Sequence, residues 1–300
     1  MSKYKPKSND LSEKSFILYI APIAAIIIFF WIIPILVSFF FSLTKYNGLS
    51  APTYIGLDNY KSLFRDKIFI ECLKNTIIFM VFIVPGQTVL AFLTASWLYK
   101  SKNSLACRFV KWTALIPTLL PVSVIGLVCR ILLNNPQSPI NTIAKFIGMN
   151  ANNLLGNKTS AMATIVVISI LLKFGYYAVL FYTNMLDISE SYFEAAKIDG
   201  VSQFSVYRNI ILPLMKPSIL LVIFLGVLDI FQHFDLIYTL TGGGPGTAGT
   251  MTVMVYLYLY GFKYSKIGYS MTIGNIMILV VALISIIQRK NLMEQESQLY

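Results

Sequence analysis

The hydrophobic positions of the chain fall into six long runs that are separated by shorter polar segments. A bilayer core about 30 Å thick needs roughly 20 apolar helical residues to cross it, and every run is long enough. The pattern therefore predicts an all-α, polytopic membrane protein with six transmembrane helices. The runs cover residues 16–43, 74–98, 110–133, 160–184, 217–238 and 268–288.

Composition and charge agree with a membrane protein. The 300 residues are 56% hydrophobic and 12% charged, whereas soluble domains are about 45–50% apolar and about 25% charged. The first run follows a basic leader and stays apolar for longer than the 7–15 residues of a signal peptide, so we expect it to be retained as a span. Lys and Arg are more frequent on the segments that lie inside when the N-terminus is cytoplasmic, which predicts that both termini are cytoplasmic.

Several other classes of protein are disfavoured by the same sequence. The net charge of +11 is distributed over the loop ends rather than gathered on one face, so we expect no nucleic-acid partner. Three widely spaced cysteines predict neither a disulfide framework nor a metal site. The glycines at 244, 246 and 249 formally match GxGxxG but follow a membrane span, so we interpret them as a tight turn rather than a dinucleotide site.

One charged, amphipathic stretch, residues 191–217, interrupts the apolar runs. Ser191 and Glu194 have the spacing of a capping box, which predicts a helix from about Tyr192 that Gly200 ends in the left-handed conformation. A second short helix is expected over about 202–211, before Pro213. A rigid, bent helical pair of this kind fits either docking of a soluble partner or packing on its own bundle.

Two charged side chains are predicted deep in the membrane. At about 1.5 Å per helical residue, Lys173 lies roughly 20 Å below the outer start of the fourth span, and Asp229 about 18 Å above the inner start of the fifth. Charges at this depth are costly and mark a pathway or a buried pair. The two side chains are expected to be close enough to pair, and a purely structural pair without ligand contact is an open alternative.

The sequence EAAKIDGVSQFSVYRNIILPLMKP, residues 194–217, resembles the EAA loop of permease subunits of binding-protein-dependent ATP-binding-cassette importers. In that family the loop is the coupling helix that sits in a cleft of the ATPase subunit, so the resemblance implies a cytoplasmic coupling loop over residues 187–217. The residues implied in coupling are Glu194, Ala195, Ala196, Asp199, Gly200, Phe204, Leu212 and Pro213.

Three further stretches are similar to carbohydrate-uptake permeases of the maltose type. They are YIGLDNYKSLFRDKIFIECLKNT (54–76), FDLIYTLTGGGP (234–245) and GYSMTIGNIMIL (268–279). The resemblance implies a sugar importer of a bacterial cell membrane that works by alternating access. Its implied partners are a second permease subunit, two ATPase subunits, an extracellular solute-binding protein, the carbohydrate and membrane lipid.

The same resemblance places a substrate pathway in the fourth and fifth spans. Positions 226, 229, 230 and 233 also share one helical face. Because a Lys and an Asp replace the neutral groups usual in the maltose-type pattern, a maltose-like ligand is in doubt. The implied pathway residues are Lys173, Tyr176, Gly226, Asp229, Ile230 and His233.

The expected organisation is a leader (1–15), a six-span permease domain (16–290) and a cytoplasmic tail (291–300). The sequence contains no GxxxxGK[ST] motif for ATP phosphates, so we expect this chain to be no enzyme and to hold no cofactor or metal, with ATP and Mg²⁺ on the partner ATPase subunits. The alternatives are the same importer for a polyol or a glycerophosphate, and an ion-coupled carrier.

Overall fold

The computed structural model describes residues 13–101, 104–135, 137–139, 142, 146, 154–245 and 249–299. The expected leader and the middle of the GGGP loop therefore lie mostly outside the described residues. The chain divides into two compact units, Met1–Leu63 with Tyr260–Ile276, and Phe64–Leu259 with Met277–Tyr300. Apart from one two-stranded ladder, the regular structure of the described residues is helical.

Four helices are long and apolar enough to cross a membrane, and the number rises to six if each of two bent helix pairs is one span. The expectation of an all-α, polytopic membrane protein is therefore confirmed, and the predicted six spans equal the upper number of candidates. The four candidates that are not broken are Tyr19–Ser42, Lys67–Lys100, Lys158–Leu186 and Ile267–Gln288. The bent pairs are Cys107–Leu119 with Val122–Asn134, and Gln203–Leu214 with Lys216–Phe231.

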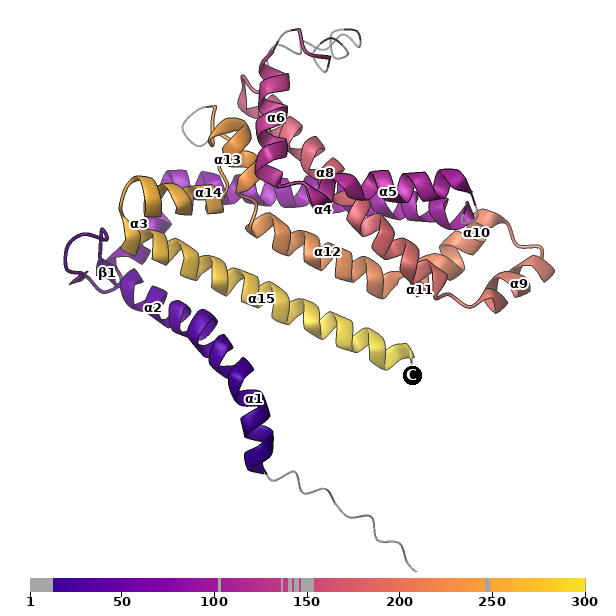
Figure 1. Ribbon diagram of the computed structural model, residues 1–300, viewed down its shortest axis with the longest axis horizontal. Helices are drawn as coiled ribbons and strands as arrows, with labels where there is room; N and C mark the ends of the chain where they lie inside the picture. Colours follow the sequence, from indigo (N-terminus) through magenta and orange to yellow (C-terminus); the bar gives the residue numbers. More distant parts are fainter. Residues whose placement is uncertain are drawn as a thin grey trace, which may run out of the picture. The chain divides into compact units, whose positions relative to one another are not determined.

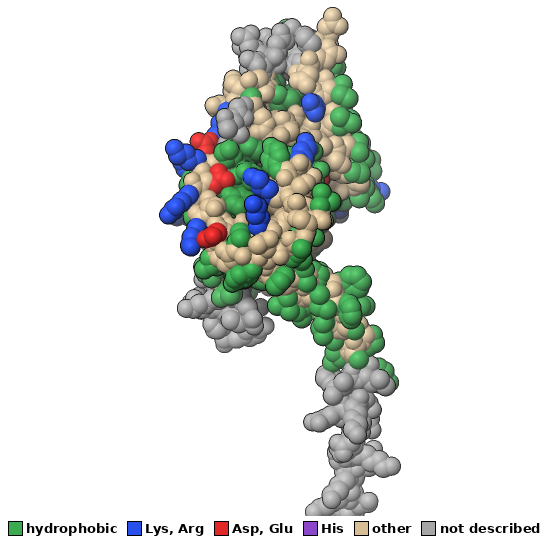
Figure 2. All heavy atoms as spheres, turned by 90° about the vertical axis from the view of Figure 1, so that its left-hand side faces the viewer, with side chains coloured by type: hydrophobic (Ala, Val, Ile, Leu, Met, Phe, Trp, Pro, Cys, Tyr) green, Lys and Arg blue, Asp and Glu red, His purple; other side chains and the backbone are tan. Residues whose placement is uncertain are grey.

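The first unit is built around the N-terminal span and the start of the last helix. Figure 2 shows the N-terminal helix as an almost continuous hydrophobic surface, and none of its apolar window is buried. The buried Ser42 hydroxyl is within 2.9 Å of the Tyr60 hydroxyl, and Asn59 donates to the Ser42 carbonyl. The elements that lie wholly or partly in this unit are α1 (Glu13–Ile27), η1 (Ile28–Ile32), α2 (Ile33–Ser42), β1 (Thr44–Lys45), antiparallel β2 (Thr53–Tyr54), α3 (Asp58–Arg65), η4 (Leu259–Lys263) and α15 (Ile267–Leu299), of which α15 belongs to the second unit from Met277 onward.

The second unit contains two long helices that run side by side, α4 and α8 (Figure 1). The helix α5 packs on α8, α12 and α14 pack on α4, and α13 packs on α6. Four short segments, α9 to α11 with a π-helical turn, connect α8 to α12. The bounds are α4 (Lys67–Lys100), α5 (Leu105–Leu119), α6 (Val122–Asn134), α8 (Lys158–Leu186), α9 (Glu190–Ile198), α10 (Gln203–Val206), η3 (Tyr207–Ile211), α11 (Leu212–Leu214), α12 (Lys216–Phe231), α13 (Asp235–Thr241) and α14 (Val253–Tyr258).

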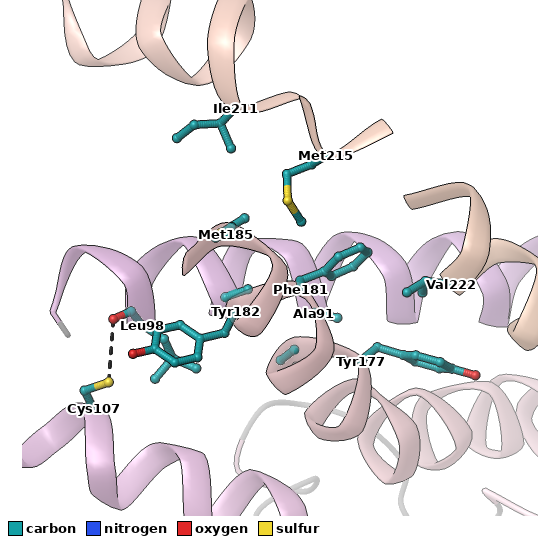
Figure 3. Packing of buried hydrophobic residues seen from close by; sticks show 12 residues of the cluster. Ala91, Leu98, Cys107, Tyr177, Phe181, Tyr182, Met185, Ile211, Met215 and Val222 are labelled. Atoms are coloured by element: carbon teal, nitrogen blue, oxygen red, sulfur yellow. Dashed lines mark hydrogen bonds between the residues drawn. The ribbon is translucent and has the colours of Figure 1, made fainter. Parts of the chain in front are cut away.

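A buried apolar cluster joins α8 to the segments that precede α12. Figure 3 shows Ile211 and Met215 above Met185 and Phe181 of α8, with Val222 of α12 beside them. Residues 177, 181 and 185 repeat at four-residue spacing, so one face of α8 carries this contact. The cluster fixes the end of α8 to the start of α12.

Two of the expected spans are interrupted. The third run is bent by 94° between α5 and α6, where Pro121 precedes the first residue of α6 and lacks the backbone N–H that a continuous helix would need. The fifth run, expected over 217–238, ends as a helix at Phe231 and restarts at Asp235. The break at 232–234 lies beside the predicted pathway.

Candidate functional site

The centre of the site is an ion pair between α8 and α12. The Lys173 ammonium lies 3.0 Å from Oδ2 of Asp229, which confirms the predicted pairing. The Tyr177 hydroxyl donates to the same carboxylate oxygen at 3.1 Å. The second oxygen, Oδ1, has no hydrogen-bond partner among the residues that the structure describes. Both charged side chains are about two-fifths exposed, so the pair can still contact a ligand.

The break between α12 and α13 places His233 next to the pair. The ring Nε2 of His233 is 3.4 Å from the Ser169 hydroxyl of α8, and its carbonyl accepts a hydrogen bond from Thr252. Non-helical backbone at membrane depth is tolerated where it is buried in protein or lines a cavity. The unwound residues 232–234 line a cavity with the ion pair, which accounts for the break.

Two cavities meet at the ion pair. A small chamber of about 190 Å³ and a large groove of about 670 Å³ share Lys173 and Asp229 in their walls. Gln232 is shared by the two cavities as well, and the other polar residues of the small chamber are Gln87, Ser169, His233 and Asp235. The large groove is lined by residues 117–120 of the α5–α6 bend, by Tyr176 and Tyr177, and by apolar positions of α12.

The predicted pathway residues are only partly brought together. Lys173, Asp229, Ile230 and His233 line the small chamber, whereas Tyr176 is about half exposed and lines the large groove. Gly226 lines neither cavity, although it shares a helical face with Asp229, Ile230 and His233. A Cβ atom at Gly226 would lie 2.5 Å from Nε2 of Gln87, so this glycine leaves room for the Gln87 amide.

Several polar residues of the site were missed by sequence reasoning, and Tyr177 and Gln87 are the most informative. Tyr177, rather than its neighbour Tyr176, holds Asp229, because neighbouring helical residues point about 100° apart and the sequence does not give the rotation of the helix. Gln87 lies on α4, and its position depends on how α4 packs against α12. A polar side chain in the middle of an apolar run was the only available signal for Gln87.

The predicted coupling loop forms a second functional region. Its first helix, α9, begins at Glu190 and has Ser189 as the N-cap, whose hydroxyl accepts from the Ser191 amide. The capping box predicted at Ser191 and Glu194 is therefore wrong, because Ser191 already lies inside the helix. Gly200 has a φ of +65°, as predicted, and Val201 donates to the Ala196 carbonyl in the pattern of a Schellman C-cap.

The second half of the loop differs from the sequence expectation at Pro213. The helix does not end before this proline but continues through α11 to Leu214, and the 65° bend follows at Met215. A π-helical turn explains the difference, since the Leu212 amide bonds to the Tyr207 carbonyl five residues back. The hydrogen bond just before the proline therefore reaches five residues back instead of the four of an α-helix. The proline itself has no N–H to donate.

The loop has an inner and an outer face. On the inner face the Phe193 ring lies 5.9 Å from the Tyr99 ring of α4, and the Tyr207 hydroxyl donates to the Ser96 carbonyl. Ala196 is buried on this side. The other predicted coupling positions are exposed, and they are Glu194, Ala195, Asp199, Gly200, Phe204, Leu212 and Pro213. The Phe204 side chain is 75% exposed, so the outer face offers an aromatic contact to a partner.

The ends of α8 and α12 are linked beside the loop as well as at the ion pair. The Asn184 amide donates to the Ser218 hydroxyl at 2.8 Å. The two helices that carry Lys173 and Asp229 are therefore the two helices that enter and leave the coupling loop. Among the described residues, no group of three or more His, Cys, Asp or Glu side chains could hold a metal ion.

The chain resembles proteins whose roles are known. It is 29% identical over 279 residues to the sulfoquinovosyl glycerol transport system permease protein SmoG of Agrobacterium fabrum, with 89% of this chain and 87% of SmoG covered. It is 29% identical over 284 residues to the lactose transport system permease protein LacF of Rhizobium radiobacter, with 90% of this chain and 91% of LacF covered.

A solved structure has the same fold. The match is to a chain of a bacterial alginate ABC transporter, crystallised in complex with an alginate pentasaccharide-bound periplasmic protein. The TM-score is 0.81 at 18% identity, and the alignment covers 92% of this chain and 93% of the other.

A family model for the inner membrane component of binding-protein-dependent transport systems matches residues 16–293. The members of this family are transport components rather than enzymes, and the long apolar helices of this chain agree with a multi-pass position in the membrane. The chain belongs to the family of binding-protein-dependent transport system inner membrane components.

Proposed function

We propose that this chain is one of two different permease subunits of an ATP-driven carbohydrate importer. The observation that carries the proposal is the continuity between the outer face of the loop and the Lys173–Asp229 pair, because α8 and α12 reach both. Relatives whose names specify lactose and sulfoquinovosyl glycerol transport support a sugar as the solute.

The proposed importer contains further subunits, and the exposed loop is the surface that one of them binds. Two ATPase subunits carry ATP and Mg²⁺, and one of them receives the loop through Glu194, Asp199 and Phe204 on its outer face. Both termini are cytoplasmic, on the same side as the loop, and an extracellular binding protein delivers the sugar to the opposite side. Closure of the ATPases moves the loop, and alternating access exposes the pathway beside Lys173 first to one side and then to the other.

The pathway chemistry suits a hydroxylated solute. Oδ1 of Asp229 is free to accept from a sugar hydroxyl, and Lys173 has further N–H groups to donate. Tyr176 presents an exposed aromatic ring to the large groove, and such a ring can cover the apolar face of a sugar. We assign Lys173, Tyr176, Asp229, Ile230 and His233 to the pathway, and we place Gly226 behind it.

The first experiment is purification of the chain from its native membrane in a mild detergent, followed by identification of co-purifying proteins by mass spectrometry. We expect an ATPase and a second permease of the same family. The complex is then reconstituted in vesicles with its binding protein and tested for ATP-driven uptake of glucose, galactose, lactose, glucuronate and glycerol 3-phosphate. Recovery of the chain alone, even after cross-linking, would contradict the proposal.

A further inference from the structure

A further cavity, which we call the inner cavity, lies between the inner face of the coupling loop and the end of α4 and has a volume of about 230 Å³. It shares no lining residue with the two cavities at the ion pair. Most of its wall is apolar or aromatic, and the Tyr99 ring of α4 lies 5.9 Å from the Phe193 ring of α9 in this wall. The other residues of this kind are Ala196, Val201, Val206, Tyr207 and Ile211.

The charged residues in the described wall of the inner cavity are two lysines. Nζ of Lys100 donates to the neutral Oε1 of Gln203 at 3.3 Å. Neither Lys100 nor Lys197 forms a salt bridge within the part of the chain that the structure describes. Each lysine is in the last turn of its helix, where the helix end supplies only about half of a negative charge. The two cations therefore lack a full counter-charge, and an anion in the cavity would be stabilised.

The inner cavity lies at the level of the lipid headgroups. The apolar run 74–98 ends directly before Tyr99 and Lys100, so these two residues stand where α4 leaves the hydrocarbon core. The preceding Trp97 is 44% exposed, and Trp, Tyr and Lys near the end of a span are typical of the membrane–water interface. The cytoplasmic leaflet contains anionic lipids, which basic segments next to a span attract. A lipid phosphate is therefore within reach of this cavity.

The wall of the inner cavity favours one kind of phosphate compound. A soluble phosphate would leave the apolar wall uncovered, whereas a phospholipid places its glycerol and first acyl carbons against it. A zwitterionic headgroup would bring a third cation next to Lys100 and Lys197, and an acidic headgroup would not. The volume of about 230 Å³ is below the roughly 300–1,000 Å³ of pockets for drug-sized ligands. The cavity thus accommodates the headgroup region rather than a whole lipid.

We infer, taking the cytoplasmic position of the loop from the proposed function, that the inner cavity binds the headgroup of an acidic phospholipid of the inner leaflet. Lys100 and Lys197 donate hydrogen bonds to the phosphate oxygens, and the apolar wall holds the glycerol backbone. Because Lys100 belongs to α4 and Lys197 to α9, the bound lipid joins the bundle to the coupling loop. It thereby supports the loop when the ATPases move it.

The test is a titration of the purified complex, with its second permease and ATPases, with dihexanoylphosphatidylglycerol, followed by native mass spectrometry. The test variant carries Lys100→Gln and Lys197→Gln. Near a membrane surface each lysine is worth about a five- to sixfold change in affinity for an anionic lipid. We therefore expect the double variant to bind its tightest lipid about thirtyfold more weakly than the unmodified complex.

The matched control is the double variant Arg208→Gln, Lys216→Gln. Both control residues are exposed, lie on the segment between α8 and α12, and do not line the inner cavity. The control removes the same charge and should keep the affinity of the unmodified complex. Equal weakening in the two double variants, or no weakening in either, would overturn the site.

Two competing ligands test the chemical class. Dihexanoylphosphatidylcholine should bind more weakly than the phosphatidylglycerol, and equal affinity would overturn the preference for an acidic headgroup. Inorganic phosphate should not displace the lipid at an equal concentration, and displacement would show that the cavity binds a soluble phosphate instead.

Vesicles test the effect on transport. Adding phosphatidylglycerol to phosphatidylcholine vesicles should raise ATP-driven uptake by the unmodified complex and by the control, but not by the variant without Lys100 and Lys197. An equal response of all three would refute the role of the lipid in supporting the loop. The titration needs no transport activity, so absence of uptake by the unmodified complex would contradict the proposed function without deciding the lipid site, which the titration decides.

Discussion

Replacing Lys173 by Met removes the cation of the ion pair and leaves the Asp229 carboxylate inside the membrane. Coulomb's law with an effective dielectric constant of about 20 gives roughly 5 kcal/mol for two unit charges 3.0 Å apart. Both side chains are about two-fifths exposed, so water screens the pair and reduces its net contribution. We expect a coupling free energy of about 1–3 kcal/mol, between the values for surface and buried pairs.

A double-mutant cycle measures this coupling. Lys173→Met, Asp229→Asn and the double variant are purified with the other subunits, and the free energy of unfolding is measured by titration with a denaturing detergent. Each single variant should be destabilised, whereas the double variant should regain much of the loss because it leaves no unpaired charge. Additive effects of the two changes would refute a direct interaction between the two side chains.

Uptake by the double variant distinguishes a pathway pair from a purely structural pair. If the pair only holds α8 to α12, the neutral double variant should import its solute at nearly the normal rate once stability is regained. If Lys173 and Asp229 contact the solute, uptake and solute-stimulated ATP hydrolysis should stay low in the stable double variant. We expect the second result, and near-normal uptake by the double variant would remove both residues from the pathway.

Three smaller changes test other parts of the site. Gly200→Val should uncouple ATP hydrolysis from uptake, because a left-handed residue with a β-branched side chain costs about 1–2 kcal/mol. The control is Gly200→Asn, which should keep uptake because Asn tolerates this conformation. Normal uptake by the valine variant would contradict the coupling role. Tyr177→Phe should lower the unfolding free energy by about 1.5–3 kcal/mol through loss of the bond to Asp229, and an unchanged value would argue against that bond. Tyr176→Ala should reduce uptake without affecting stability, because its ring is about half exposed, and unaffected uptake would exclude it from the pathway.

The sequence was sufficient for features that depend on short segments. Long apolar runs predict membrane spans because the length of a run has to match the bilayer. Gly200 was predicted to end α9 because few other residues adopt its backbone conformation. The similar depths of Lys173 and Asp229 indicated that the two side chains could pair. These predictions need no knowledge of how the helices are rotated or packed.

Other features depend on the packing of distant segments and were not predictable. Gln87 is close to Gly226 only because α4 packs on α12. Which of Tyr176 and Tyr177 reaches Asp229 depends on the rotation of α8. The helix continues through Pro213 because a π-helical turn changes the hydrogen-bond register just before it, and a local rule about proline does not include such a turn.

The ion pair and the coupling loop are related by a simple geometry. Lys173 lies thirteen residues before the end of α8 at Leu186, and Asp229 lies thirteen residues after the start of α12 at Lys216. At about 1.5 Å per residue, both charged groups are therefore about 20 Å along their helices from the loop. The loop end of this hairpin is joined by the hydrogen bond from Asn184 to the Ser218 hydroxyl.

The α8 and α12 helices are joined at two places, by the Lys173–Asp229 ion pair and by the Asn184–Ser218 hydrogen bond. We therefore expect the two helices to move as one body when the ATPases move the loop. Cysteines at positions 184 and 218, joined by a short bifunctional thiol reagent, should therefore leave most of the ATP-driven uptake intact. The native Cys129 is replaced by Ser, because it is more accessible than the buried Cys72 and Cys107. If the cross-link abolished uptake and a reducing agent restored it, the two helices would have to separate during transport, and the loop would act by opening the hairpin rather than by moving it as a unit.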